Sequence, residues 1–183
     1  MDGASDHELM ARAGQGDGRA FHLLARRHAG RAVALARRML GNDAMAEEIV
    51  QDALLRVWIN APRWRPEAAF HTWLYRIVVN LCLNAKRRPD PLPLAAADDV
   101  ADPAPLADAQ LEQRERDRRL AAAIDALPAR QRAAIVLTYQ EGLSNAEAAS
   151  VLDASVPGFE ALLVRARRTL RATWDSDGTE GSA

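Results

Sequence analysis

Apolar residues recur at three- and four-residue intervals along most of the chain, which is the spacing of helices that bury one face. In the first half this pattern predicts helices over residues 6–13, 17–40, 43–60 and 70–88. In the second half it predicts helices over residues 114–127, 128–141, 145–152 and 155–174. Few segments alternate apolar with polar residues, so the sequence predicts an all-α fold.

Polar residues and glycines at the ends of these segments predict where helices start and stop. Asp43 and Ser155 are expected to cap the helices that they precede. Gly41 and Gly142 are expected to stop the helices before them. In the helix over residues 114–127, Leu120 is expected to face inward.

The segment over residues 89–111 has a different composition. It holds five of the nine prolines, five acidic residues and no basic residue. Proline opposes helix formation, so this segment is expected to be a flexible acidic linker. It separates two small helical domains over residues 1–88 and 112–174, and residues 175–183 are expected to form an acidic disordered tail.

Charge is distributed unevenly over these parts, although the formal net charge is only −1. Residues 1–90 carry fourteen basic and ten acidic side chains, and residues 112–174 carry ten basic and eight acidic ones. Two mildly basic folded units fit contact with nucleic acid better than the total charge suggests. The surplus is modest, so tight DNA binding by the free protein is not implied.

The helix over residues 43–60 has an acidic face. Glu47, Gln51 and Asp52 lie away from its apolar stripe. A solvated helix face would show this pattern, and so would a docking surface for a basic partner.

The helix over residues 70–88 combines aromatic rings with cations. Five of the nine aromatic residues of the chain lie between Trp58 and Tyr75, and three basic residues close the helix. Rings beside cations can stack unpaired bases while the cations neutralise phosphates. Core packing is the other explanation for such rings, and it is the one expected for Phe70.

Residues 144–174 show a short helix, a tight break and a longer helix rich in arginine. Ser144 and Glu147 have the spacing of a capping box at the start of the short helix. This order is typical of a helix-turn-helix, whose second helix enters a DNA major groove. A plain helical hairpin would show much of the same pattern.

Two stretches of the chain resemble the extracytoplasmic-function sigma factors, the small bacterial transcription-initiation factors. An acidic motif, an aromatic motif and an arginine pair resemble the second region of that family, on Ala46-Glu47-Glu48, Gln51-Asp52, Phe70, Trp73-Leu74, Ile77, Asn80 and Arg87-Arg88. The stretch from LPARQRAAIVLTYQEGLS through LSNAEAASVL to VRARRTL resembles the fourth region. Together these resemblances cover nearly the whole chain except the linker and the tail.

The resemblance implies a sigma factor that binds core RNA polymerase, directs it to promoter DNA and helps to open the duplex. It implies that polymerase is bound by Glu47, Glu48, Gln51 and Asp52. It implies that the −10 strand is held by Trp64, Trp73, Arg76, Asn80, Asn84, Lys86, Arg87 and Arg88. It implies that the −35 duplex is read by Ser155, Pro157, Gly158, Glu160, Ala161, Arg165, Arg167 and Arg168. An anti-sigma factor is a further expected partner.

The start of the recognition helix departs from the family pattern. Glu160 and Leu162 stand where some members of the family carry arginine. A glutamate can accept a hydrogen bond from cytosine N4 in the major groove, and it can equally weaken the attraction to phosphate. The −35 specificity is therefore the part of the resemblance that transfers least.

Motifs for catalysis and metal binding are missing from the sequence. It contains no CxxC, HExxH, GxxxxGK[ST] or GxGxxG motif and no nucleophile elbow. We therefore expect no enzymatic activity, metal site, cofactor or small-molecule substrate. The single cysteine, Cys82, fits a reducing cytoplasm, and no apolar run is long enough to insert into a membrane.

Two other functions remain open from the residues alone. A helix-turn-helix regulator would bind operators without polymerase, usually as a dimer, and it leaves the pattern over residues 46–88 unexplained. A helical adaptor that binds only proteins gives no role to Trp73, Asn80 or the arginine clusters. The salt dependence of binding distinguishes the adaptor from the DNA-binding functions, because the affinity that comes from phosphate contacts falls steeply as the salt concentration rises.

Overall fold

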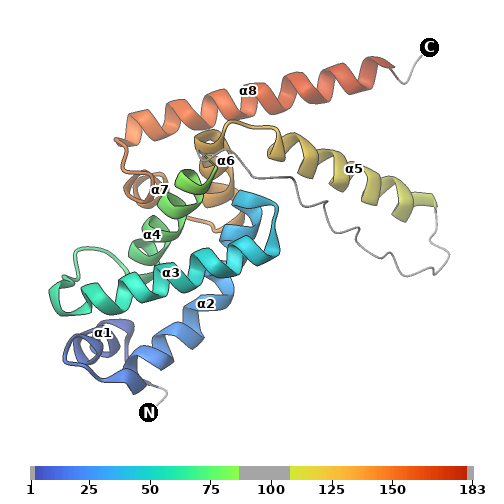
Figure 1. Cartoon of the computed structure of the whole chain (residues 1–183). Helices are drawn as coiled ribbons and strands as arrows, with labels where there is room; N and C mark the ends of the chain where they lie inside the picture. The colour runs from blue at the N-terminus through green and yellow to red at the C-terminus, as the bar shows by residue number, and fades with distance from the viewer. Residues whose placement is uncertain (1–2, 87–107, 181–183) are drawn as a thin grey trace.

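The computed structural model describes the backbone over residues 3–86 and 108–180 (Figure 1). The first module contains α1 (Asp6–Gly14), α2 (Gly18–Leu40), α3 (Asp43–Asn60), the 3-10 turn η1 (Ala61–Arg63) and α4 (Phe70–Ala85). The second module contains α5 (Asp108–Asp125), α6 (Ala129–Ile135), the π-helical turn η2 (Val136–Gln140), α7 (Asn145–Val151) and α8 (Val156–Glu180). No strand occurs in these two ranges, and the predicted all-α fold is confirmed.

The central helix of the first module is α2, which packs against α1, α3 and α4. Leu24, Leu35 and Met39 on its apolar stripe are buried. Phe70, at the start of α4, is 2% exposed, as expected of a core residue. Because burial of one large apolar side chain contributes about 1.5–3 kcal/mol, these residues fix how the helices pack.

The start of α3 corrects one prediction. The N-cap is Asn42, whose side-chain oxygen accepts a hydrogen bond from the Met45 amide at 2.9 Å. Asp43 lies one residue further on, inside the helix, and forms an ion pair with Arg37. Asparagine and aspartate are equally good caps, so two of them side by side cannot be told apart without the backbone. Gly41 ends α2 with a φ of 70°, as predicted.

The second module contains the predicted helix-turn-helix, formed by α7 and α8. Ser144 and Glu147 make the expected capping box, and Ser155 Oγ accepts a hydrogen bond from the Gly158 amide at 3.2 Å. Phe159, on the first turn of α8, is 0% exposed and anchors this helix in the core. The helix expected over residues 128–141 is divided into α6 and η2, and it stops at Gly142 with a φ of 68°.

Several boundaries differ from the predictions. The helix α4 ends at Ala85, so Arg87 and Arg88 lie outside the described residues, as do residues 89–107 of the predicted linker. The helix α5 already begins at Asp108, and α8 continues to Glu180 through residues expected to form a disordered tail. Extending an existing helix costs little free energy, because each added residue also adds a hydrogen bond.

Leu120 corrects another prediction, since it is 45% exposed rather than turned inward. The helix α5 packs mainly against α8, and most of its length lies apart from the other helices in Figure 1. The apolar pattern of a helix shows which face is apolar, but a neighbouring element must be present to cover that face.

The two modules pack against each other. The helix α7 lies against α4, and α6 contacts α2 and α4 (Figure 1). Buried apolar residues from both modules belong to one hydrophobic cluster. The helical segments and the linker predicted two modules, but they did not predict this contact.

Candidate nucleic-acid interface

A groove of about 740 Å³ lies where the end of α3, the loop after it and α4 meet. Its walls carry four arginines and two tryptophans: Arg56, Arg63, Arg65, Arg76, Trp64 and Trp73. Asn80 and Thr72 supply hydrogen-bonding groups to the same walls. Four of the residues that the resemblance assigns to the −10 strand, Trp64, Trp73, Arg76 and Asn80, therefore come together in one cationic, aromatic groove.

The two tryptophans of the groove are close to each other. The ring centroids of Trp64 and Trp73 lie 6.4 Å apart at an interplanar angle of 50°. Both side chains are half-buried, and His7 of α1 makes an edge contact with Trp64 at 5.2 Å. Rings held in this way keep part of their faces available for stacking while their positions stay fixed.

The loop that carries Trp64 is held against α1 by a close backbone approach. A Cβ atom on Gly14 would lie 2.8 Å from the carbonyl oxygen of Ala61. Glycine at this position therefore allows α1 and η1 to approach closely. Pro62, inside η1, further restricts the backbone that leads to Trp64.

The outer face of α4 carries a polar stripe. Arg76, Asn80 and Asn84 are exposed and follow one another at intervals of four residues, so they share one face of the helix. Lys86 follows at the C-terminal end of α4, where burial, followed by the nearby charge of Arg132, lowers its pKa. Asn84 and Lys86 do not line the groove, and they extend the polar surface along α4 beyond it.

The acidic residues assigned to polymerase lie on α3. Glu47, Glu48 and Gln51 are exposed. Asp52 is half-buried and pairs with Arg56 one turn later, at 3.0 Å. These residues form a continuous surface on the side of α3 that faces away from the core.

Sequence reasoning missed the apolar continuation of this surface. Leu55 is 56% exposed and Ile59 is 64% exposed, and both continue the four-residue spacing of Glu47 and Gln51. Their exposure was not predicted, because α3 contains many other apolar residues. Their offset from the buried stripe of Val50, Ala53 and Val57 was the signal that could have separated them.

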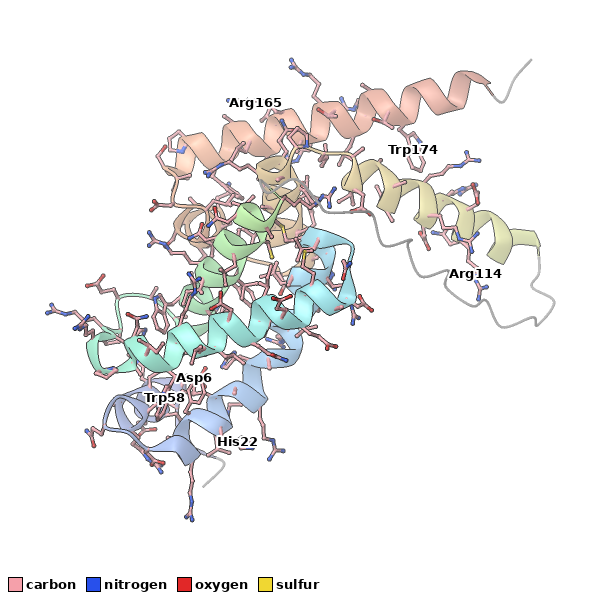
Figure 2. All side chains as sticks on the ribbon, viewed as in Figure 1. Asp6, His22, Trp58, Arg114, Arg165 and Trp174 are labelled. Atoms are coloured by element: carbon pink, nitrogen blue, oxygen red, sulfur yellow. The ribbon has the colours of Figure 1, made fainter. Side chains whose placement is uncertain are left out.

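The residues assigned to the −35 duplex lie along the first half of α8. Arg165 and Arg168 are exposed, and Figure 2 labels Arg165 on this helix. The Arg167 guanidinium lies 5.5 Å from the centre of the Tyr139 ring. This cation–π contact sets the direction of the Arg167 side chain.

At the start of α8, the assigned residues have different surroundings. Ser155 uses its hydroxyl to cap the helix, and Pro157 and Gly158 are exposed on the first turn. Ala161 is half-buried. Glu160 is exposed, and its Oε1 accepts a hydrogen bond from Asn145 Nδ2 at 3.1 Å, which links the two helices of the helix-turn-helix.

The described residues form neither a metal site nor a membrane span. No group of three or more histidine, cysteine, aspartate or glutamate side chains there could hold a metal ion. Among the helices of the described ranges, none combines the length and apolarity needed to cross a bilayer.

Known proteins resemble both modules. Residues 24–90 match the sigma-70 region 2 family, and residues 117–170 match sigma-70 region 4. The chain is 38% identical over 168 residues to the ECF RNA polymerase sigma factor SigM of Mycobacterium tuberculosis, which covers 91% of this chain and 83% of SigM.

Two further proteins extend the comparison. The ECF RNA polymerase sigma factor SigE of Mycolicibacterium smegmatis is 36% identical over 152 residues, which is 81% of this chain and 59% of SigE. The solved structure of CnrH, a sigma factor of Cupriavidus metallidurans, in complex with the cytosolic domain of CnrY has a TM-score of 0.69 and 32% identity. That match covers 95% of this chain and 99% of CnrH.

Proposed function

Since this chain belongs to the extracytoplasmic-function RNA polymerase sigma factors, we propose that it binds core RNA polymerase and directs it to promoters with −35 and −10 elements. The first module carries the polymerase and −10 surfaces, and the second module carries the −35 surface. The protein acts in the cytoplasm and performs no catalytic step itself.

The groove between α3, the loop and α4 carries this proposal. Four arginines on its walls neutralise the phosphates of a single strand, and Trp64 and Trp73 offer ring faces to unpaired bases. Each base stacked on an aromatic ring contributes about 1–3 kcal/mol. That energy favours the open −10 strand over the paired duplex, so strand opening needs no cofactor.

The stripe on α4 extends this strand-binding surface. Arg76 neutralises a phosphate, while Asn80 and Asn84 offer amide donors and acceptors to the edges of exposed bases. Lys86 adds a further cation beyond the groove. Arg87 and Arg88 continue this role in the residues that follow.

Two protein partners complete the proposal. Glu47, Glu48, Gln51 and Asp52 form an acidic surface that suits a basic surface on core polymerase. CnrH is similar over almost the whole chain and was solved with the cytosolic domain of CnrY. An anti-sigma protein is therefore proposed as the second partner.

Transcription by purified core polymerase tests the function directly. With sheared genomic DNA as template, addition of the protein is expected to produce discrete new RNA 5′ ends that share upstream −35 and −10 sequences. Core polymerase alone serves as the control. Absence of new starts together with failure to co-elute with core polymerase would contradict the proposal and favour an operator-binding regulator.

Glu160 is expected to set part of the −35 preference. Replacement of Glu160 by alanine removes a base-edge acceptor and the hydrogen bond to Asn145, so the set of accepted −35 sequences should change. The discrimination at the affected base pair should fall by about 1–3 kcal/mol. Selection from a randomised −35 library measures this, with Val164→Ala on the same helix as the control. An equal loss of affinity on every sequence would show that Glu160 acts only through charge or structure.

A further inference from the structure

The second module lies on the surface of the first module that is proposed to bind the −10 strand. The helix α7 packs on α4, the helix that carries Arg76 and Asn80. Ser150 of α7 lines the same groove as Trp73 and Arg76. One wall of the proposed strand-binding groove is therefore supplied by the −35 module.

Glu141, which follows η2 in the second module, is the centre of the polar contact. Its Oε2 accepts a hydrogen bond from the Tyr75 hydroxyl at 2.8 Å, and its Oε1 accepts one from Arg38 Nη1 at 2.7 Å. The Glu141 side chain is 8% exposed, and both donors belong to the first module. Burial, and then the hydrogen bond to Glu141, raise the pKa of Tyr75, so its hydroxyl remains a donor at neutral pH.

A nearly buried carboxylate needs partners that replace water. Here both carboxylate oxygens find them across the module boundary, on α2 and α4. Loss of one partner of a buried, charged hydrogen bond is strongly unfavourable. The three residues Tyr75, Arg38 and Glu141 therefore form a latch that is complete only while the modules are together.

Two more contacts cross the same boundary. Arg76 Nη2 pairs with Asp153 Oδ1 at 2.8 Å, in the turn between α7 and α8. While it is paired with a carboxylate, Arg76 is less available to a DNA phosphate. Arg132, which is 4% exposed, donates from Nη1 to the carbonyl oxygen of Met39 at 3.1 Å.

We infer that the second module covers the −10 strand surface of the first module in the free protein, and that the latch of Tyr75, Arg38 and Glu141 holds this closed arrangement. The inference rests on the proposed function. Elements named −35 and −10 are centred about 25 base pairs apart, which is roughly 85 Å at 3.4 Å per base pair. A molecule whose α7 touches α4 does not span that distance, so promoter binding requires the modules to separate.

Closure lowers the apparent affinity for the open strand. A ligand that binds only the open form binds less tightly by the fraction of molecules that are open. Core polymerase raises that fraction if it holds the modules apart. The latch thus makes specific strand binding conditional on polymerase, and it does so without an anti-sigma protein.

Reversal of the charge on Glu141 tests the latch. Glu141→Lys places a cation against Arg38 and Tyr75, so the modules should separate. The affinity of the free protein for a fluorescent single-stranded −10 oligonucleotide should rise about tenfold. Glu115→Lys makes the same charge change on α5, where Glu115 pairs with Arg119 of its own helix, and it should leave the affinity within about twofold of the unchanged protein.

A distance measurement provides a readout that needs neither DNA nor polymerase. Spin labels at Arg26 on α2 and Ala146 on α7, both exposed, report the separation of the modules. Burial raises the pKa of the Cys82 thiol to about 12, so this buried cysteine stays unlabelled. Glu141→Lys should broaden and lengthen the distance distribution, and the swap Arg38→Glu with Glu141→Arg should restore both the short distance and the weak strand binding.

The outcomes separate this inference from the proposed function. An unchanged distance distribution in Glu141→Lys, or a broad distribution in the unaltered protein, would overturn the closed form. Separation with no gain in strand affinity would overturn the covering of the −10 surface. Failure of the unaltered protein to start transcription with core polymerase would contradict the proposed function while leaving the distance result standing.

Discussion

Replacement of Phe159 by alanine is expected to destabilise the second module by about 3–5 kcal/mol, because a fully buried phenyl ring is lost and a cavity remains. Phe159 lies on the first turn of α8, so the loss loosens the packing between the two helices of the helix-turn-helix. For a chain of 183 residues, the melting temperature should fall by roughly 6–20 °C. Thermal unfolding followed by circular dichroism measures the change.

Val164→Ala on the same helix is the matched control. Val164 is 63% exposed, so its truncation should change stability by no more than about 0.5 kcal/mol. Binding to a −35 duplex should fall for Phe159→Ala and stay close to the original for Val164→Ala. Similar melting temperatures for the two variants would contradict the packing of α8 through Phe159.

Replacement of both Glu47 and Glu48 by lysine is expected to abolish most promoter-specific transcription. The two exposed acids become cations, and like charges brought together at an interface cost several kcal/mol. Because each 1.4 kcal/mol is a factor of ten, affinity for core polymerase should fall by about 100-fold or more. Titration of labelled protein with core polymerase measures the affinity directly.

The control for this variant changes the same charge elsewhere. Glu115→Lys with Asp117→Lys alters two exposed acids on α5, where Glu115 pairs with Arg119 and Asp117 accepts a hydrogen bond from Gln113 of the same helix. This pair should retain polymerase binding. Neither pair should shift the melting temperature much, since exposed charge changes contribute little to stability. Equal loss in the two variants would show that net charge, and not the surface on α3, decides polymerase binding.

The existence and order of the helices were predictable because their signals are local. Apolar spacing, Gly41, Gly142 and the capping box of Ser144 with Glu147 all act within one or two turns of chain. The helix boundaries were predicted less accurately: the N-cap of α3 is Asn42, and the sequence predicted Asp43. The choice between two adjacent capping residues depends on backbone angles that neither residue determines alone.

The candidate site was predictable in its composition but not in its shape. Sequence reasoning named Trp64, Trp73, Arg76 and Asn80, and the structure brings all four into one groove. The same groove also contains Arg56, Arg63 and Arg65, which sequence reasoning did not single out. Their inclusion depends on how the end of α3 and η1 turn toward α4, and no spacing within one helix encodes that turn.

By itself, the sequence determined an all-α chain of two modules and the residue types that suit polymerase, a single strand and a duplex. Those properties follow from periodicity and composition, which are carried by neighbouring residues. Only the tertiary structure decided that the modules touch and that Tyr75 and Arg38 meet Glu141. These partners lie 66 and 103 residues apart in sequence, so their contact depends on how whole helices pack and has no local signal.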